Sequence, residues 1–143
     1  MKVSDILRTK GSEVVTVLPD QPIQDAVRTL VDNNIGAMVV FDGEMKGIIS
    51  ERDVLRFAAT DIQRLVGARV RDLMTAHVIT TTPDADIQNV MDVMTEHRIR
   101  HLPVVANGSV CGIISIRDVV NALRQNVQAE NAHLHAYILG TAS

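Results

Sequence analysis

The spacing of apolar residues alternates between strand-like and helix-like stretches, and the same order of stretches occurs twice along the chain. Short β-branched runs at 14–17 and 78–81 predict strands. Each run is followed by apolar residues at helical spacing, which predicts an amphipathic helix. Near-continuous apolar runs at 37–41 and 102–106 then predict buried strands. The two helical stripes consist of Ile23, Ala26, Val27, Leu30 and Val31, and of Ile87, Val90, Met91 and Met94.

Turn signals complete the pattern of each half. The sequences "DGE" and "NGS" favour hairpin turns, followed by returning strands at 46–49 and 111–114 and then by helices. Before the first helix of each half, Asp20 and Asp84 are predicted as N-caps and Pro22 as a first helical residue. Each half is therefore predicted to be β-α-β-β-α, which makes the chain a mixed α+β protein.

The two halves align as copies of one unit. Pro19 and Pro83 align at an offset of 64, whereas Gly47 and Gly112 align at 65, which places one additional residue in the second hairpin. Such self-similarity indicates homologous units that bury their apolar faces together. We expect a leading helix at 3–7 within repeat 1 (1–66), a second leading helix at 70–76 within repeat 2 (67–125), and a helical tail at 126–143.

The most similar segments are the octets "GIISERDV" (47–54) and "GIISIRDV" (112–119), which agree at seven of eight positions. Their Ser-x-x-Asp pattern is typical of a capping box at a helix start. The same groups also suit a nucleotide: the hydroxyl and helix dipole attract phosphate, the carboxylate accepts from ribose hydroxyls, and the arginine neutralises charge. Both interpretations stay open here, although two copies favour binding.

Composition narrows the classes of partner. The chain has 143 residues and a net charge of -3, which gives no electrostatic reason to expect nucleic acid. Aromatic residues make up 2%, too few for stacking platforms that bind single strands. There is no apolar leader and no run approaching a membrane span. We therefore expect neither nucleic acid nor membrane as a partner, and a cytoplasmic location.

Catalytic and metal-binding motifs do not occur in the sequence. Strings such as G-x-S-x-G, H-E-x-x-H or a P-loop are missing, and no recognisable base lies near either octet serine. A predicted helix end separates His97 from His101, and His133 and His135 point to different sides of a helix. We therefore expect no enzymatic activity, no metal site and no covalent cofactor.

The order T-x-x-P, helix, "IRHLPVV" and "NGSVCGIISIRD" resembles the cystathionine-β-synthase (CBS) domain, and two such units in tandem resemble a Bateman module. The resemblance covers about residues 1–125. It implies two repeats packed sheet to sheet about a pseudo-twofold axis, with two clefts for adenine nucleotides such as AMP, ADP, ATP, NAD(H) or S-adenosylmethionine. It also implies a homodimer, a disc of four CBS units.

The resemblance further implies which residues line the clefts, each of which is built from both repeats. At the second octet, Ser115 and Asp118 are expected to bind phosphate and ribose. The other residues assigned to that cleft are Lys10, Ser12, Ile35, Gly36, Ala37, Arg100, His101, Ile113 and Arg117. The mirror cleft at the first octet is assigned Ser50, Arg52, Asp53, Ile99 and Arg100.

The clefts are not expected to be equal. Arg100 and His101 bring positive charge, whereas Gly36 and Ala37, at the corresponding place in repeat 1, carry none and are expected to leave room for a base at the Ser115/Asp118 cleft. We therefore predict the Ser115/Asp118 cleft as the better nucleotide site. The predicted function is an adenine-nucleotide sensor, for AMP above all, that acts on an unidentified effector protein through rearrangement of a CBS dimer. The alternative is a structural or protein-interaction module without ligand, in which Ser-x-x-Asp only caps helices.

Overall fold

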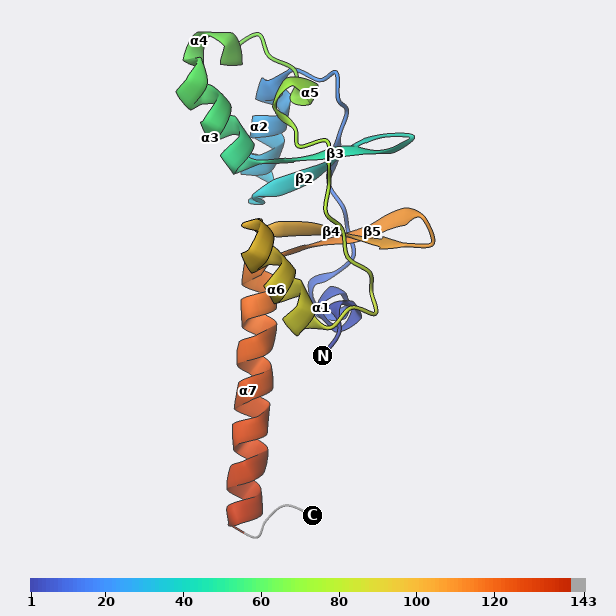
Figure 1. The fold of residues 1–143 in the computed structure, drawn as a ribbon, viewed down its shortest axis with the longest axis vertical. Coiled ribbons are helices and arrows are strands. Elements are labelled where there is room, and N and C mark those ends of the chain that lie inside the picture. Colours follow the sequence, from blue (N-terminus) through green and yellow to red (C-terminus); the bar gives the residue numbers. More distant parts are fainter. Residues whose placement is uncertain (140–143) are drawn as a thin grey trace.

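The computed structural model describes residues 1–139, and it has two α/β units, one above the other, with a long helix that projects from the lower unit (Figure 1). The two hairpins lie toward the middle of the molecule (Figure 1). In chain order the elements are α1 (Val3–Lys10), β1 (Thr16–Val17), α2 (Ile23–Asp32), β2 (Ala37–Asp42), β3 (Glu44–Ser50), α3 (Glu51–Thr60), α4 (Ile62–Leu65), α5 (Val70–Leu73), α6 (Ile87–His97), β4 (His101–Ala106), β5 (Ser109–Ser115) and α7 (Ile116–Ile138).

The predicted mixed α+β class and the two hairpins are confirmed. In repeat 1, β2 pairs antiparallel with β3 around Gly43, whose φ is 73°. In repeat 2, β4 pairs antiparallel with β5 around Asn107 and Gly108, whose φ values are 53° and 78°. Positive φ at both central residues is what a two-residue hairpin requires. The additional residue of the second repeat therefore lies in this turn, as the change of offset predicts.

The first predicted strand of each repeat is shorter than expected. Thr16 and Val17 form a two-residue β1 parallel to β2, but in repeat 2 the described residues keep one parallel bridge, from Thr81 to Val104. The cause lies in the partner strand. Val39 donates its N–H to Val15, whereas its counterpart Pro103 has no N–H to donate. The ladder therefore does not extend along 78–81.

The predicted N-caps are wrong by two residues. Pro22 is the N-cap of α2 and makes no side-chain cap, and Asp86 caps α6 by accepting from the Gln88 N–H at 2.9 Å. The carboxylate of Asp20 instead pairs with Arg71 near α5. The chain turns at 19–20 and at 83–84, and bridges from Pro22 to Arg69 and from Asp86 to Lys2 then hold it beside the leading helix of the other repeat.

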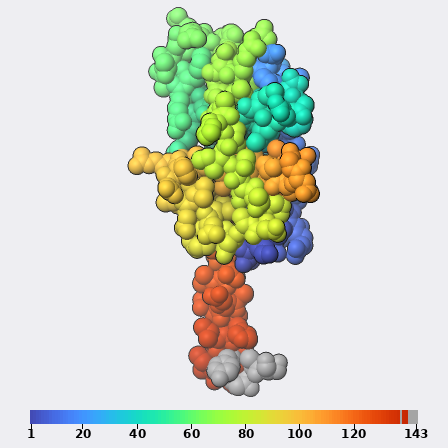
Figure 2. All heavy atoms as spheres, turned by 45° about the vertical axis from the view of Figure 1, so that its right-hand side comes forward, coloured from blue at the N-terminus to red at the C-terminus, as the bar shows by residue number. Residues whose placement is uncertain are grey.

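The helical stripes pack as expected, with one exception, Val31, whose side chain is 71% exposed. Helix α7 continues without a break from the second octet into the tail as far as Ile138, and residues 140–143 of the predicted helical tail lie outside the described part. The space-filling view shows the second half of α7 clear of the body (Figure 2). In the described part, no helix is long and apolar enough to cross a membrane.

The two repeats exchange their leading helices. Val3 and Ile6 of α1 are buried in the core of repeat 2, and Val70 and Leu73 of α5 are buried in the core of repeat 1. Matching backbone bonds hold both: the Val3 N–H donates to Ala85, and the Val70 N–H donates to Gln21, each at 2.9 Å. Neither core is complete without a segment of the other repeat, so the two units stabilise each other.

The octet glycines are explained by this exchange. A Cβ atom at Gly47 would lie 2.7 Å from the carbonyl oxygen of Thr75, just after α5. A Cβ atom at Gly112 would lie 2.7 Å from a methyl carbon of Leu7 in α1. In both octets the leading segment of the other repeat therefore crosses directly over the glycine, at a distance that leaves no room for a side chain.

We expect Gly47→Ala to lower the free energy of unfolding by about 1–3 kcal/mol, because a rigid carbonyl group blocks the added methyl. Gly112→Ala is expected to cost less, since the end of the Leu7 side chain can move. Gly67→Ala serves as the control, because nothing lies within 4 Å of its Cβ position. Urea denaturation measures all three, and equal losses for Gly47→Ala and Gly67→Ala would contradict the close approach.

Candidate functional site

Both octets form the predicted capping boxes. At the start of α3, the Asp53 carboxylate accepts from the Ser50 N–H at 2.9 Å, and the Asp53 N–H donates to the Ser50 hydroxyl at 3.4 Å. At the start of α7, Asp118 and Ser115 make the same two bonds at 2.8 and 3.2 Å. The Ser50 hydroxyl also donates to Asp53 at 3.1 Å. The capping interpretation of Ser-x-x-Asp is thus confirmed, and any ligand role adds to it.

A backbone bond attaches each octet helix to its own repeat. The Glu51 N–H donates to the Gly36 carbonyl at 3.0 Å, and the equivalent Ile116 N–H donates to the Arg100 carbonyl at 2.8 Å. These first-turn amides are therefore not free to bind an anion. An anion at either octet would therefore need donors other than these two amides.

The first octet borders a partly enclosed cavity of about 140 Å³ that both repeats line. Repeat 1 contributes the end of β3 and the start of α3. Repeat 2 contributes the linker after α5 and the junction between α6 and β4. The lining residues are Ile48, Ser50, Glu51, Arg52, Asp53, Arg56, Thr75, His77, Val78, Ile79, Arg98, Ile99, Arg100 and His101.

Positive charge dominates the polar part of this cavity. It has four arginines against two carboxylates, those of Glu51 and Asp53. In the described part of the chain, none of the four arginines takes part in an ion pair. Guanidinium groups left without an anion are suited to bind phosphate in a bidentate manner. The arginines are Arg52, Arg56, Arg98 and Arg100.

The remaining chemistry of the cavity suits the rest of a nucleotide. Asp53 accepts from the Thr75 hydroxyl at 3.3 Å through one oxygen and from Ser50 through the other, and a carboxylate still has acceptor sites for further hydroxyl groups. Four aliphatic side chains form an apolar wall, against which a flat base can pack. They are Ile48, Val78, Ile79 and Ile99.

The second octet differs because its aspartate already has a cationic partner. The Lys10 ammonium, at the end of α1, donates to Asp118 at 2.6 Å and to the Ile113 carbonyl at 2.8 Å. Burial raises the pKa of Asp118, but hydrogen bonds from Lys10 and Ser115 outweigh it and hold this pKa below its ordinary value. The structure therefore brings Lys10 to the second octet, where its contacts are with the aspartate and the strand carbonyl.

His101 lies between the two clefts. It lines the first cavity, and its ring is 3.2 Å from where a Cβ atom of Gly36 would be. The space that Gly36 was expected to leave for a base in the second cleft is therefore taken by the imidazole. Ala37 offers little surface there, because it is buried in β2 and 4% exposed.

The pKa of half-buried His101 is below its ordinary value of 6.5, because burial disfavours the charged ring; Glu51 and Asp118 raise it, and Lys10 and Arg100 lower it. As the pH falls, His101 therefore takes up a proton in the unfolded chain before it does so in the folded chain. We expect the free energy of unfolding to decrease from about pH 6.5 downward, until the pH lies below the pKa of His101 in the folded protein. Urea midpoints between pH 8 and 5 should fall less for His101→Gln. An identical decline in both proteins would exclude this histidine as the cause.

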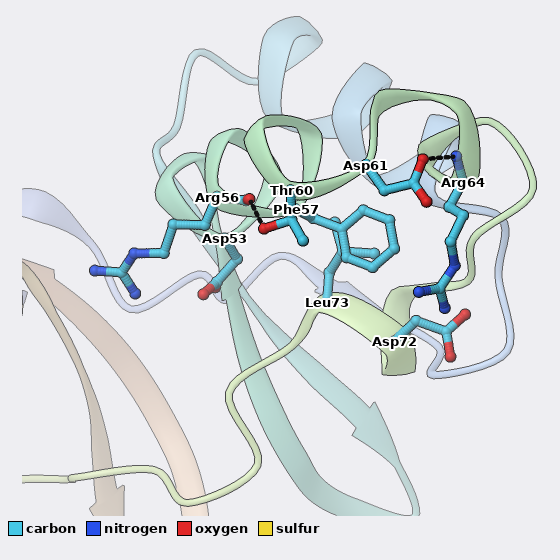
Figure 3. A pocket seen from close by; sticks show the side chains of 8 residues that line it. All are labelled: Asp53, Arg56, Phe57, Thr60, Asp61, Arg64, Asp72 and Leu73. Atoms are coloured by element: carbon cyan, nitrogen blue, oxygen red, sulfur yellow. Dashed lines mark hydrogen bonds between the residues drawn. The ribbon is translucent and has the colours of Figure 1, made fainter.

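A second cavity, of about 230 Å³, lies on the outer side of repeat 1 between α3, α4 and α5 (Figure 3). Its side chains include Phe57, with Arg64 stacked at 5.6 Å over the ring, and three carboxylates with two arginines. Asp53 and Arg56 line both cavities. The mixed charges around this cavity do not point to one class of ligand, so the first cavity is the better candidate site.

The structure gathers six of the residues assigned from the sequence in one cavity: Ser50, Arg52, Asp53, Ile99, Arg100 and His101. Of the others, it joins Lys10 to Ile113 and Asp118, and it leaves Ser12 and Arg117 exposed. The linker residues Thr75 to Ile79 were missed. The alignment of the leading helices contained the signal, because the offset that aligns Val3 with Val70 also aligns Lys10 with His77.

These features define a duplicated α+β module whose two units share their cores and together line a cavity at the first octet. The CBS domain family model matches residues 3–60 and 70–125. The chain therefore belongs to the CBS domain family and contains a tandem pair of its repeats. The mitochondrial CBS domain-containing protein CBSX3 of Arabidopsis thaliana is 36% identical over 148 residues, which cover 96% of this chain and 72% of that protein.

Solved structures agree with the assignment. The CBS-domain containing protein ATU1752 from Agrobacterium tumefaciens is 41% identical, with a TM-score of 0.83, over 85% of this chain and 98% of that one. The CBS domain pair of protein MJ0100 is 26% identical, with a TM-score of 0.77, over 88% and 98%. The crystal structure of that pair is a complex with 5'-methylthioadenosine and S-adenosyl-L-methionine.

Proposed function

We propose that this CBS pair is a regulatory module that binds an adenine nucleotide, AMP above all, in the cleft at the first octet. The observation that carries this proposal is a cavity in which an acceptor carboxylate, four arginines without ion pairs among the described residues and an aliphatic wall come together from both repeats. The adenosyl ligands of the MJ0100 pair support the adenosine part of the assignment.

The volume of the cavity suggests which parts of the nucleotide are enclosed and which lie at its open rim. Pockets that enclose a drug-sized ligand measure about 300–1,000 Å³, and this cavity, at about 140 Å³, is smaller. We therefore place the base against the aliphatic wall, the ribose at Asp53 and the phosphate at the open rim. Arg98 and Arg100 belong to repeat 2 and Arg52 to repeat 1, so the phosphate would connect the two repeats.

The clefts are proposed to be unequal, but in the opposite order to the one predicted from the sequence. Arg100 was expected in both clefts and His101 in the second alone, beside the space that Gly36 leaves. In the structure both line the first cavity, and the imidazole fills that space. The geometry therefore favours the first octet as the nucleotide site.

The regulatory step would be a change in how the repeats and their copies pack. A ligand held by both repeats stabilises the arrangement that it binds best, and no other source of conformational change is needed. We propose a homodimer in the cytoplasm that signals to an unidentified effector. Its pairing surface is the α3–α4 face, because Leu55, Ile62 and Val66 are 67%, 63% and 86% exposed there.

Thermal-shift and calorimetric titrations with AMP, ATP, NADH, S-adenosylmethionine and adenosine test the function. A ligand present at ten times its Kd should raise the free energy of unfolding by roughly 1.4 kcal/mol. AMP is expected to bind more tightly than adenosine, because adenosine lacks the phosphate. If no compound shifts unfolding at millimolar concentration, the alternative function, a structural module whose octets only cap helices, is the correct one; the capping boxes already formed favour it.

A further inference from the structure

The two octet aspartates are equivalent in sequence but differ in what approaches them. Asp53 faces the cavity, and its contact from the leading segment of repeat 2 is the neutral Thr75 hydroxyl at 3.3 Å. Asp118 receives the Lys10 ammonium at 2.6 Å. The residue that aligns with Lys10 is His77, which lines the first cavity and, within the described residues, makes no ion pair with a carboxylate of the first octet.

Lys10 is held at two points rather than one. Its ammonium connects Asp118 of α7 to the Ile113 carbonyl of β5, so it lies across the end of the strand and the start of the helix. The two side chains of this ion pair are 37% and 20% exposed, so solvent screens the contact in part and a competing ligand can reach it. A ribose hydroxyl would have to donate to the carboxylate oxygen that the ammonium now contacts.

We infer that Lys10 is the residue that sets how many nucleotides a chain takes, because it occupies the ribose position of the second cleft. This inference rests on the proposed function. Each chain then binds one nucleotide, at the first octet, and the second octet is closed by the chain's own lysine. The ligand class of the second cleft is the same, a nucleoside with a free ribose diol, but binding requires displacement of the ammonium.

Isothermal titration of AMP into wild type and Lys10→Met tests the inference. Methionine keeps the length and apolar stem of lysine but removes the charge and the donor. We expect one AMP per chain for wild type and two for Lys10→Met. Arg8→Met, on the same helix with a side chain that is 76% exposed, is the control and should bind one.

A second pair of variants separates the clefts. Asp53→Asn should bind AMP at least tenfold more weakly than wild type, and adding Lys10→Met to it should restore one AMP per chain, at the second octet. A stoichiometry of one for Lys10→Met with no rescue in the double variant would overturn the inference, as would loss of binding in Lys10→Met. Wild type that binds no nucleotide would instead refute the proposed function, so the two failures are distinguishable.

Discussion

Asp53→Asn is expected to weaken AMP binding about 10- to 100-fold, whereas Asp118→Asn should leave the affinity nearly unchanged. The carboxylate of Asp53 faces the cavity and can accept from both ribose hydroxyls. A hydrogen bond to a charged group contributes about 1.5–3 kcal/mol, and each 1.4 kcal/mol is tenfold in affinity. The asparagine replaces one acceptor oxygen by a donor and removes the charge at nearly constant volume.

Asp118→Asn is a closely matched control. Both aspartates occupy the third position of an octet helix and complete a capping box, so both variants lose the same capping interaction. The part of any stability loss that comes from the cap is therefore shared, and calorimetry with AMP at constant pH reports the difference that is due to the site. Equal losses of affinity would mean that the clefts are equivalent, and a larger loss for Asp118→Asn would restore the order that the sequence suggested.

The local features of this fold could be predicted from the sequence because short-range chemistry decides them. Ser-x-x-Asp at a strand end is sufficient for a capping box, and "NG" between apolar runs is sufficient for a tight hairpin. The duplication supports both the capping boxes and the hairpins, because the same pattern recurs in the same order. The one-residue change of offset located the additional residue in the turn at Asn107 and Gly108.

The long-range features could not be predicted in the same way. Nothing in the local pattern at Val3 or Val70 says that each leading helix completes the core of the other repeat. The N-caps were misplaced for the same reason: Asp20 is taken by Arg71 of the exchanged helix, so it is not available to cap α2. Tertiary contacts overrode a local preference that is worth about 1 kcal/mol.

The candidate site shows the same difference between local features, which could be predicted, and long-range features, which could not. The residue types were identified from the octets, but their grouping depends on which repeat supplies the wall of which cleft. Arg100 was assigned to both clefts and His101 to the second alone, whereas the structure places both residues in the first cavity. Gly36 was expected to leave space for a base, but an imidazole from the other repeat fills it. A glycine indicates a close approach without indicating what approaches.

The exchange of helices also has a consequence for signalling. The leading segments that cross the octet glycines continue into the residues that face the octet aspartates, Lys10 after α1 and Thr75 after α5. A ligand at the first octet would therefore contact the segment after α5. This segment belongs to repeat 2, but its helix is anchored in the core of repeat 1. Displacement of that segment would be transmitted to both cores, which is a physical route from binding to a change in repeat packing.

Arg100→Met is expected to weaken AMP binding about 10- to 100-fold and to leave adenosine binding nearly unchanged. The guanidinium group lines the cavity and has no ion pair in the described part of the chain, so its charge is available to the phosphate. A charge-assisted bond to an anion contributes about 1.5–3 kcal/mol. Adenosine has no phosphate, so its affinity reports whether the substitution has disturbed the base and ribose positions.

Arg124→Met, on an exposed part of α7 outside the cavity, controls for the loss of one positive charge from the protein as a whole. Calorimetric titrations at two salt concentrations sharpen the comparison, because the AMP affinity of wild type should fall with added salt more steeply than that of Arg100→Met. If adenosine and AMP lose affinity equally, Arg100 supports the shape of the site and does not contact phosphate. If neither changes, the phosphate lies elsewhere, and the cavity at the first octet does not bind the nucleotide in the proposed orientation.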